Sequence, residues 1–152
     1  MKQSQVLFVG NILSEHKGTK GVSEKIVTIF SSEMHIGAVS KKANKILRFA
    51  DILYTCLTYN YKVLIADTYS DTAFTIARLS SIAAKLRDKK IVLVLRGGRL
   101  PDFYKENKSA VDKVLKRSHH IVTPSLYLHS FFNNLGYKIE YLPNYIDTSI
   151  FF

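Results

Sequence analysis

Short apolar runs rich in β-branched residues alternate along this chain with longer segments of helical period. The clearest runs span residues 6–9, 63–66, 91–95 and 120–123, and weaker ones fall within 34–39 and 138–142. Runs that stay largely apolar are typical of strands covered on both faces, as in a parallel sheet. Strands that alternate with helices indicate an α/β fold. We therefore expect a doubly wound, Rossmann-like domain with a mostly parallel sheet of about six strands and helices on both faces.

Two of the segments between the strands carry an apolar stripe at helical spacing. The first stripe consists of Val22, Ile26, Ile29 and Phe30. The second consists of Ile46, Leu47, Ala50, Leu53, Tyr54 and Leu57. A short final helix is expected after Ser125, which is a good N-cap residue, and Gly136 is placed to end it.

Two further helices are predicted from their capping residues. Ser70 or Asp71 is placed to cap a helix that runs to about Leu86. Asp102 is placed to open another helix that continues through Leu115. Both positions carry the short polar side chains that accept hydrogen bonds from the first free N–H groups of a helix.

Length and composition predict a single globular domain over residues 1–152. Hydrophobic residues make up 47% of the chain and charged residues 22%, which excludes a disordered or collagen-like protein. No run approaches the roughly 20 apolar residues of a membrane span, and no signal-peptide pattern follows residues 6–9. The lone Cys56 cannot form an intramolecular disulfide. We expect a cytoplasmic protein in a reducing compartment.

The formal net charge of +10 favours anionic partners, although it does not select one. The densest basic stretch comprises Lys41, Lys42, Lys45 and Arg48, and a second comprises Lys85, Arg87, Lys89 and Lys90. Such runs are also common on solvated surfaces without a partner. We expect no nucleic-acid partner, because no helix-turn-helix, RNA-recognition or zinc-finger signature is present. His119, His120 and His129 have no carboxylate at matching spacing, so no metal site is expected.

In a parallel α/β fold, ligands bind at the loops that follow the carboxyl ends of the strands. The loop after the first strand contains Lys17, Gly18, Lys20 and Gly21. There, glycine would allow a ligand close to the backbone and lysine would neutralise a phosphate. A plain flexible turn fits this loop equally well, since neither the G-x-G-x-x-G nor the G-x-x-x-x-G-K-[ST] pattern is present.

Two later loops place polar side chains at the same edge. Asp67 and Tyr69 follow the strand at 63–66, where Asp67 either binds the hydroxyl groups of a ligand or fixes the turn before the next helix. The strand at 91–95 runs into Arg96, Gly97, Gly98 and Arg99. Two arginines beside two glycines suit a phosphate-bearing ligand, and loop geometry without a ligand is the alternative.

The last thirty residues resemble a known sequence block. The block consists of Ile121-Val-Thr-Pro-Ser125, Leu135-Gly-Tyr137 and Leu142-Pro-Asn-Tyr-Ile-Asp147, with Phe151 behind it. It is similar to the end of the N-terminal domain of retaining GT-B glycosyltransferases of family 4. Two positions depart from the family pattern: Tyr145 replaces the usual glycine, and Arg96 stands where the family often has a histidine.

The resemblance implies the acceptor-binding half of a two-domain hexosyltransferase whose C-terminal, donor-binding domain is absent from this chain. Such an enzyme transfers a sugar from a nucleotide-sugar to a polysaccharide or glycolipid precursor with retention, without a metal or another cofactor. Arg96 would then be a catalytic residue, and Lys17, Gly18, Lys20, Gly21, Asp67, Tyr69, Gly97, Gly98 and Arg99 would bind substrate.

The same resemblance places a hinge at Asn144 and Asp147 and adds two expectations. The chain alone should be inactive. Many such enzymes act on lipid-linked acceptors, so an anionic membrane surface, as in peripheral attachment to the inner face of the membrane, is an expected partner. The alternative from a different class is a non-catalytic α/β module that binds a nucleotide or another anionic ligand.

Overall fold

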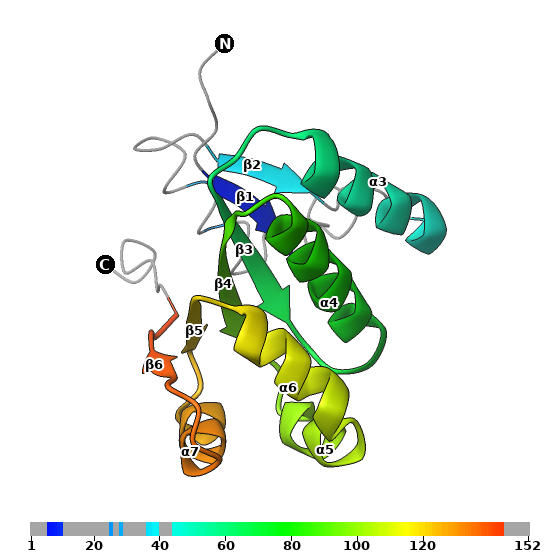
Figure 1. Ribbon diagram of the computed structural model, residues 1–152. Helices are drawn as coiled ribbons and strands as arrows, with labels where there is room; N and C mark the ends of the chain where they lie inside the picture. The colour runs from blue at the N-terminus through cyan, green and yellow to red at the C-terminus, as the bar shows by residue number, and fades with distance from the viewer. Residues whose placement is uncertain (1–5, 11–24, 26–27, 29–35, 40–43, 145–152) are drawn as a thin grey trace, which may run out of the picture.

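The computed structural model describes residues 6–10, 25, 28, 36–39 and 44–144. Within them, six strands form one all-parallel sheet in the order β2-β1-β3-β4-β5-β6 (Figure 1). The strands are β1 (Val6–Val9), β2 (Ile36–Val39), β3 (Val63–Thr68), β4 (Lys90–Leu95), β5 (His120–Thr123) and β6 (Glu140–Tyr141). The order runs outward from β1 in both directions, as in doubly wound Rossmann-like folds. The predicted fold class is therefore confirmed.

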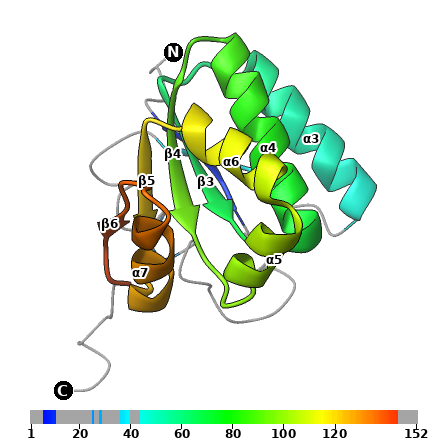
Figure 2. The ribbon, with the colours of Figure 1, turned by 60° about the horizontal axis from the view of Figure 1, so that its bottom comes forward.

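Helices connect the later strands. They are α3 (Lys45–Thr58), α4 (Asp71–Leu86), α5 (Leu100–Glu106), α6 (Lys108–Arg117) and α7 (Leu126–Asn134). Ser125 caps α7 as predicted, by accepting a hydrogen bond from the backbone N–H of Leu128 at 3.3 Å. Ser70 occupies the predicted N-cap position of α4, but its side chain makes no capping hydrogen bond. Gly136, with φ of 89°, follows the end of α7. Figure 2 shows α7 beside β5 and β6, at the opposite end of the sheet from α3.

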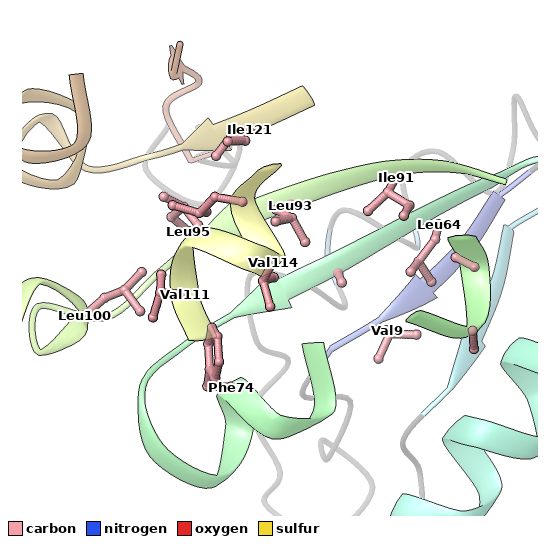
Figure 3. Packing of buried hydrophobic residues seen from close by; sticks show 14 of the residues in the cluster. Val9, Leu64, Phe74, Ile91, Leu93, Leu95, Leu100, Val111, Val114 and Ile121 are labelled. Carbon is pink, nitrogen blue, oxygen red and sulfur yellow. The ribbon is translucent and has the colours of Figure 1, made fainter. Parts of the chain in front are cut away.

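The core lies between one face of the sheet and these helices (Figure 3). Alternate strand residues point into it, and they are Leu7, Val9, Leu64, Ala66, Ile91, Leu93, Leu95 and Ile121. Each of the five described helices adds buried side chains to the same cluster. On the other face Val63, Ile65 and Val92 are half-buried. Of the helix predicted through Val22, Ile26, Ile29 and Phe30, only Lys25 and Thr28 lie within the described residues, and both are helical.

The prediction of one helix that starts at Asp102 is wrong. The structure has two helices there, and the first begins earlier, at Leu100, with Pro101 in its first turn. Proline fits that turn because its missing N–H would have no partner in the helix. Asn107 separates α5 from α6, and its side-chain amide donates to the carbonyl of Phe103 at 3.2 Å. This hydrogen bond closes the end of α5 and so competes with continuation of a single helix.

The apolar stripe predicted on α3 is present, but it is not the buried side of the helix. α3 packs on the sheet through Ile52 and Cys56, whereas Ile46, Leu47, Tyr54 and Leu57 are exposed. Burial raises the pKa of the Cys56 thiol to about 11, so this cysteine is a neutral core residue. The periodicity identified residues that share a face of α3 without identifying the face that meets the sheet.

Candidate functional site

A cavity of about 350 Å³ opens at the carboxyl ends of β1 and β3. Its lining consists of Val9, Gly10, Arg48, Asp67, Tyr69, Ala73 and Ile76. In the sheet, β2 lies on one side of β1 and β3 lies on the other. The connection from β1 to β2 and the connection from β2 to β3 therefore run in opposite directions across the sheet. Such a switch point leaves a crevice at the carboxyl edge, and it is the general ligand site of open α/β sheets.

Arg48 reaches the cavity from the second turn of α3. The helix starts at Asn44, whose side-chain oxygen accepts from the backbone N–H groups of Ile46 and Leu47 at 3.0 and 3.3 Å. Since α3 follows β2 in a parallel sheet, its first turns lie at the carboxyl edge. Arg48 is half-buried and therefore lines the cavity together with Asp67 and Tyr69.

Asp67 and Arg96 form a buried ion pair beside the cavity. The Nε atom of Arg96 donates to Oδ1 of Asp67 at 2.7 Å, and the two side chains are 10% and 1% exposed. The Nη1 atom of Arg96 also donates to the side-chain oxygen of Asn144 at 3.2 Å. A chain of polar contacts thus runs from the end of β3, through the end of β4, to the segment that follows β6.

The polypeptide after β6 is held near Arg96 by Thr123. The backbone N–H of Leu142 donates to the carbonyl of Thr123 at 2.9 Å. The buried hydroxyl of Thr123 donates to the carbonyl of Leu95, also at 2.9 Å. These bonds tie the Pro143-Asn144 sequence to the ends of β4 and β5, which brings two of the predicted functional residues, Arg96 and Asn144, into contact.

Tyr69 packs under the glycine loop after β4. Gly97 has φ of 87°, and a Cβ atom there would lie 3.2 Å from Cδ1 of Tyr69, so both the backbone and the space favour glycine. By contrast, a Cβ on Gly98 would meet no atom within 4 Å. Burial, and then the charge of Asp67, raise the pKa of the Tyr69 phenol. Its hydroxyl is therefore a neutral group at pH 7, able to donate to a ligand oxygen.

Gly10 brings the backbone of β1 against Asp67. A Cβ at this position would lie 2.5 Å from Cε1 of Phe8 and 2.7 Å from Oδ2 of Asp67. We expect Gly10→Ala to cost about 1–3 kcal/mol in the free energy of unfolding, because the added methyl group forces both neighbours to move. Urea denaturation followed by circular dichroism measures this loss. Gly98→Ala is the matched control, and an equal loss in the two variants would contradict the close approach at Gly10.

Arg99 lies outside this buried network. Its Nη1 atom is 3.4 Å from Oδ2 of Asp71, and its side chain is 74% exposed. Ser70, the N-cap residue of α4, donates its hydroxyl to the same carboxylate at 2.8 Å. The two arginines of the loop therefore differ, since Arg96 is fixed in the protein and Arg99 extends from its surface.

The structure brings together Asp67, Tyr69, Arg96, Gly97 and Asn144 of the residues predicted from the sequence. Lys17, Gly18, Lys20, Gly21 and Asp147 lie outside the described residues, so their predicted roles stay predictions. Sequence reasoning missed Arg48 and Gly10 as lining residues. Only their positions in the sequence could have identified them. Gly10 directly follows β1, and Arg48 lies near the start of a helix that begins at the carboxyl edge of the sheet.

Within the described part of the chain, no three His, Cys, Asp or Glu side chains gather where they could hold a metal ion. The helices described there include none that is both long and apolar enough to cross a membrane. The polar residues that line the cavity are Arg48, Asp67 and Tyr69, which carry a guanidinium, a carboxylate and a phenol. Together they can bind a ligand that carries hydroxyl groups and a negative charge.

We compared the chain with protein-family models, with curated proteins and with solved structures, and none of the three comparisons gives a match.

Proposed function

We propose that this chain is the acceptor-side domain of a retaining glycosyltransferase, and that the cavity between β1 and β3 binds a hydroxylated, phosphorylated acceptor. The observation that carries the proposal is the position of this cavity at the switch point of the sheet, with Arg48, Asp67 and Tyr69 in its lining. A carboxylate and a neutral phenol suit the hydroxyl groups of a sugar, and a guanidinium suits its phosphate.

Arg96 has a distinct role in the proposal. Its contacts with Asp67 and Asn144 occupy two of the five N–H donors of a guanidinium, and they hold the side chain at the carboxyl edge. The remaining donors would stabilise negative charge on the diphosphate that leaves a nucleotide-sugar in a following donor domain. Asn144 would link this group to the hinge between the domains, because it lies in the Pro-Asn sequence after β6.

Ligand binding to the chain tests the proposal without requiring transfer. We expect a hexose phosphate to bind more tightly than the same free hexose or inorganic phosphate in isothermal titration calorimetry. Arg48→Ala is expected to weaken that binding about tenfold to a hundredfold, since a hydrogen bond to a charged group contributes about 1.5–3 kcal/mol. Its melting temperature should stay close to that of the parent chain.

Arg78→Ala is the matched control, because it removes an exposed arginine of α4 that does not line the cavity. It should leave the affinity unchanged. Equal affinity for inorganic phosphate and for the hexose phosphate would favour the alternative, an anion-binding module without transferase activity. Unchanged hexose phosphate binding in Arg48→Ala would contradict the assignment of this cavity.

A further inference from the structure

His119 is joined to Ile91 by two hydrogen bonds at the amino edge of the sheet, opposite to the edge that carries the cavity. The pairing of β4 with β5 begins at Val92 and His120. One residue earlier, the backbone N–H of His119 donates to the carbonyl of Ile91 at 2.8 Å. The backbone N–H of Ile91 donates in turn to Nδ1 of the His119 ring at 3.1 Å. An imidazole nitrogen therefore accepts where a backbone carbonyl is the usual acceptor in a sheet.

This hydrogen bond depends on the protonation state of the ring. A backbone N–H can only donate, so Nδ1 of His119 carries its lone pair, and the proton of the neutral ring lies on Nε2. A proton added to Nδ1 would turn it into a second donor that faces the N–H of Ile91. Backbone carbonyls do not change in this way between pH 5 and pH 8, whereas histidine does.

The groups around His119 favour the neutral ring. Desolvation of the ring, and then the positive charges of Lys90 and Lys85, lower the pKa of the His119 imidazole below its ordinary value. His120 lowers this pKa as well, and the carboxylate of Asp88 opposes the shift. These neighbours come from α4, the turn after it, β4 and β5. The folded protein therefore holds the ring in the form that accepts a hydrogen bond.

A cavity of about 240 Å³ lies beside the ring. Its lining consists of Ser118, His119, His120, Ile121, Lys138 and Glu140. Oε1 of Glu140 lies 3.4 Å from Nδ1 of His120, so the acid of this cavity contacts the neighbouring ring. Lys138 is the other charged residue of the lining. His119 is exposed and Ile91 is fully buried. Water can therefore hydrate a protonated His119 ring in the cavity, outside its hydrogen bond with Ile91.

We propose that His119 is a pH-sensitive clasp, which holds the start of β5 against β4 while its ring is neutral and releases it when Nδ1 takes up a proton. The opening is local, since β5 pairs with β4 in regular register from His120 onward. It is also separate from the proposed acceptor cavity, which lies at the carboxyl edge. The stabilisation by the clasp is complete above the unfolded pKa of histidine, about 6.5, and is lost as the pH falls from there toward the lower folded value.

Amide hydrogen exchange followed by NMR tests the clasp at Ile91 itself. Between pH 7.5 and pH 5, the protection factor of the Ile91 amide should fall about threefold to thirtyfold, because the released ring has a pKa of about 6.5 and becomes protonated. The amide of Lys90 is the internal control, since it donates to the backbone carbonyl of Lys62 at 3.0 Å. Its protection factor should not fall with that of Ile91. An equal fall at the two amides would overturn the local clasp.

His119→Asn is the variant that separates the proton from the hydrogen bond. The side-chain oxygen of asparagine can accept from the N–H of Ile91 but does not titrate, so the protection of Ile91 should lose its pH dependence. His120→Asn is the matched control, because the ring of His120 contacts the carboxylate of Glu140 rather than a backbone N–H. It should keep the pH dependence of the parent chain.

Two results would overturn the proposal. One is an equal pH dependence of Ile91 protection in His119→Asn and in the parent chain. The other comes from the parent chain alone and requires no variant to fold. Long-range ¹H–¹⁵N correlation spectra should show the His119 ring at pH 7.5 with its proton on Nε2. A proton on Nδ1 at that pH would exclude the hydrogen bond on which the clasp depends.

Discussion

Arg96→Ala is expected to lower the free energy of unfolding by about 3–5 kcal/mol, which corresponds to a fall of roughly 10 °C in the melting temperature of a domain of this size. The substitution leaves the carboxylate of Asp67, which is 1% exposed, without its arginine. A buried charge that loses an ion-pair partner keeps the cost of desolvation and loses the attraction that this partner supplied. The variant also loses the contact from Arg96 to Asn144. Chemical denaturation at pH 7 measures the change.

Two further variants separate the ion pair from a general effect on the loop. Arg99→Ala removes the neighbouring exposed arginine and should change the free energy of unfolding by less than about 0.5 kcal/mol. The double variant Asp67→Asn/Arg96→Met should be more stable than Arg96→Ala, because it removes the buried charge together with its partner. An Arg96→Ala variant as stable as Arg99→Ala would show that the pair contributes little to the fold.

The sheet was predictable because its strands are apolar runs between helical segments. Each predicted run contains or overlaps a strand, and β3 extends to Thr68 past the predicted end at residue 66. The break between α5 and α6 was not predicted from the sequence. It is marked by a single side-chain hydrogen bond, from Asn107 to the carbonyl of Phe103, and the apolar pattern does not indicate such a bond. Nor did it reveal the orientation of α3. An apolar stripe lowers the free energy only where another surface covers it, and periodicity contains no information about that surface.

For the site, the sequence identified the residues that follow strands, because the carboxyl ends of parallel strands meet at one edge. Asp67, Tyr69 and Arg96 were found for this reason. The contacts of Arg96 with Asp67 and with Asn144 were not predicted, since these residues are 29 and 48 positions away from it in the sequence. Contacts over such distances depend on strand order, which one sequence does not specify. Arg48 was assigned only to a basic run because its position in the cavity depends on where α3 begins.

The second largest loss of stability is expected at Asp112, whose carboxylate is the centre of a hydrogen-bonded cluster remote from the cavity. The hydroxyl of Tyr104 donates to Oδ1 of Asp112 at 2.9 Å, and the hydroxyl of Tyr137 donates to the same oxygen. Nζ of Lys108 lies 2.8 Å from Oδ2. The carboxylate therefore joins α5, α6 and the segment after α7. We expect Asp112→Ala to cost about 2–4 kcal/mol in the free energy of unfolding, because two partly buried hydroxyls lose a charged acceptor.

Acid should remove the contribution of Asp112 in the parent chain. The hydrogen bond from Lys108, followed by that from Tyr137, lowers the pKa of the Asp112 carboxyl from 3.8 to about 2. A carboxyl group with a lowered pKa in the folded state stabilises the fold fully above its unfolded pKa, and this stabilisation disappears as the pH falls toward the folded value. The difference in melting temperature between the parent chain and Asp112→Asn should therefore be constant above about pH 5 and shrink between pH 4 and pH 2.

Asp102→Asn provides the control for that titration. Asp102 is an exposed carboxylate whose Oδ1 lies 3.0 Å from Nζ of Lys105, three residues along the same helix. Such a surface pair contributes little, so the Asp102→Asn and parent melting curves should coincide from pH 7 to pH 4. If the difference between Asp112→Asn and the parent chain stayed constant down to pH 2, the charge on Asp112 would not be what joins α5, α6 and Tyr137. The two tyrosine hydroxyls would then stabilise the fold through packing or through other acceptors.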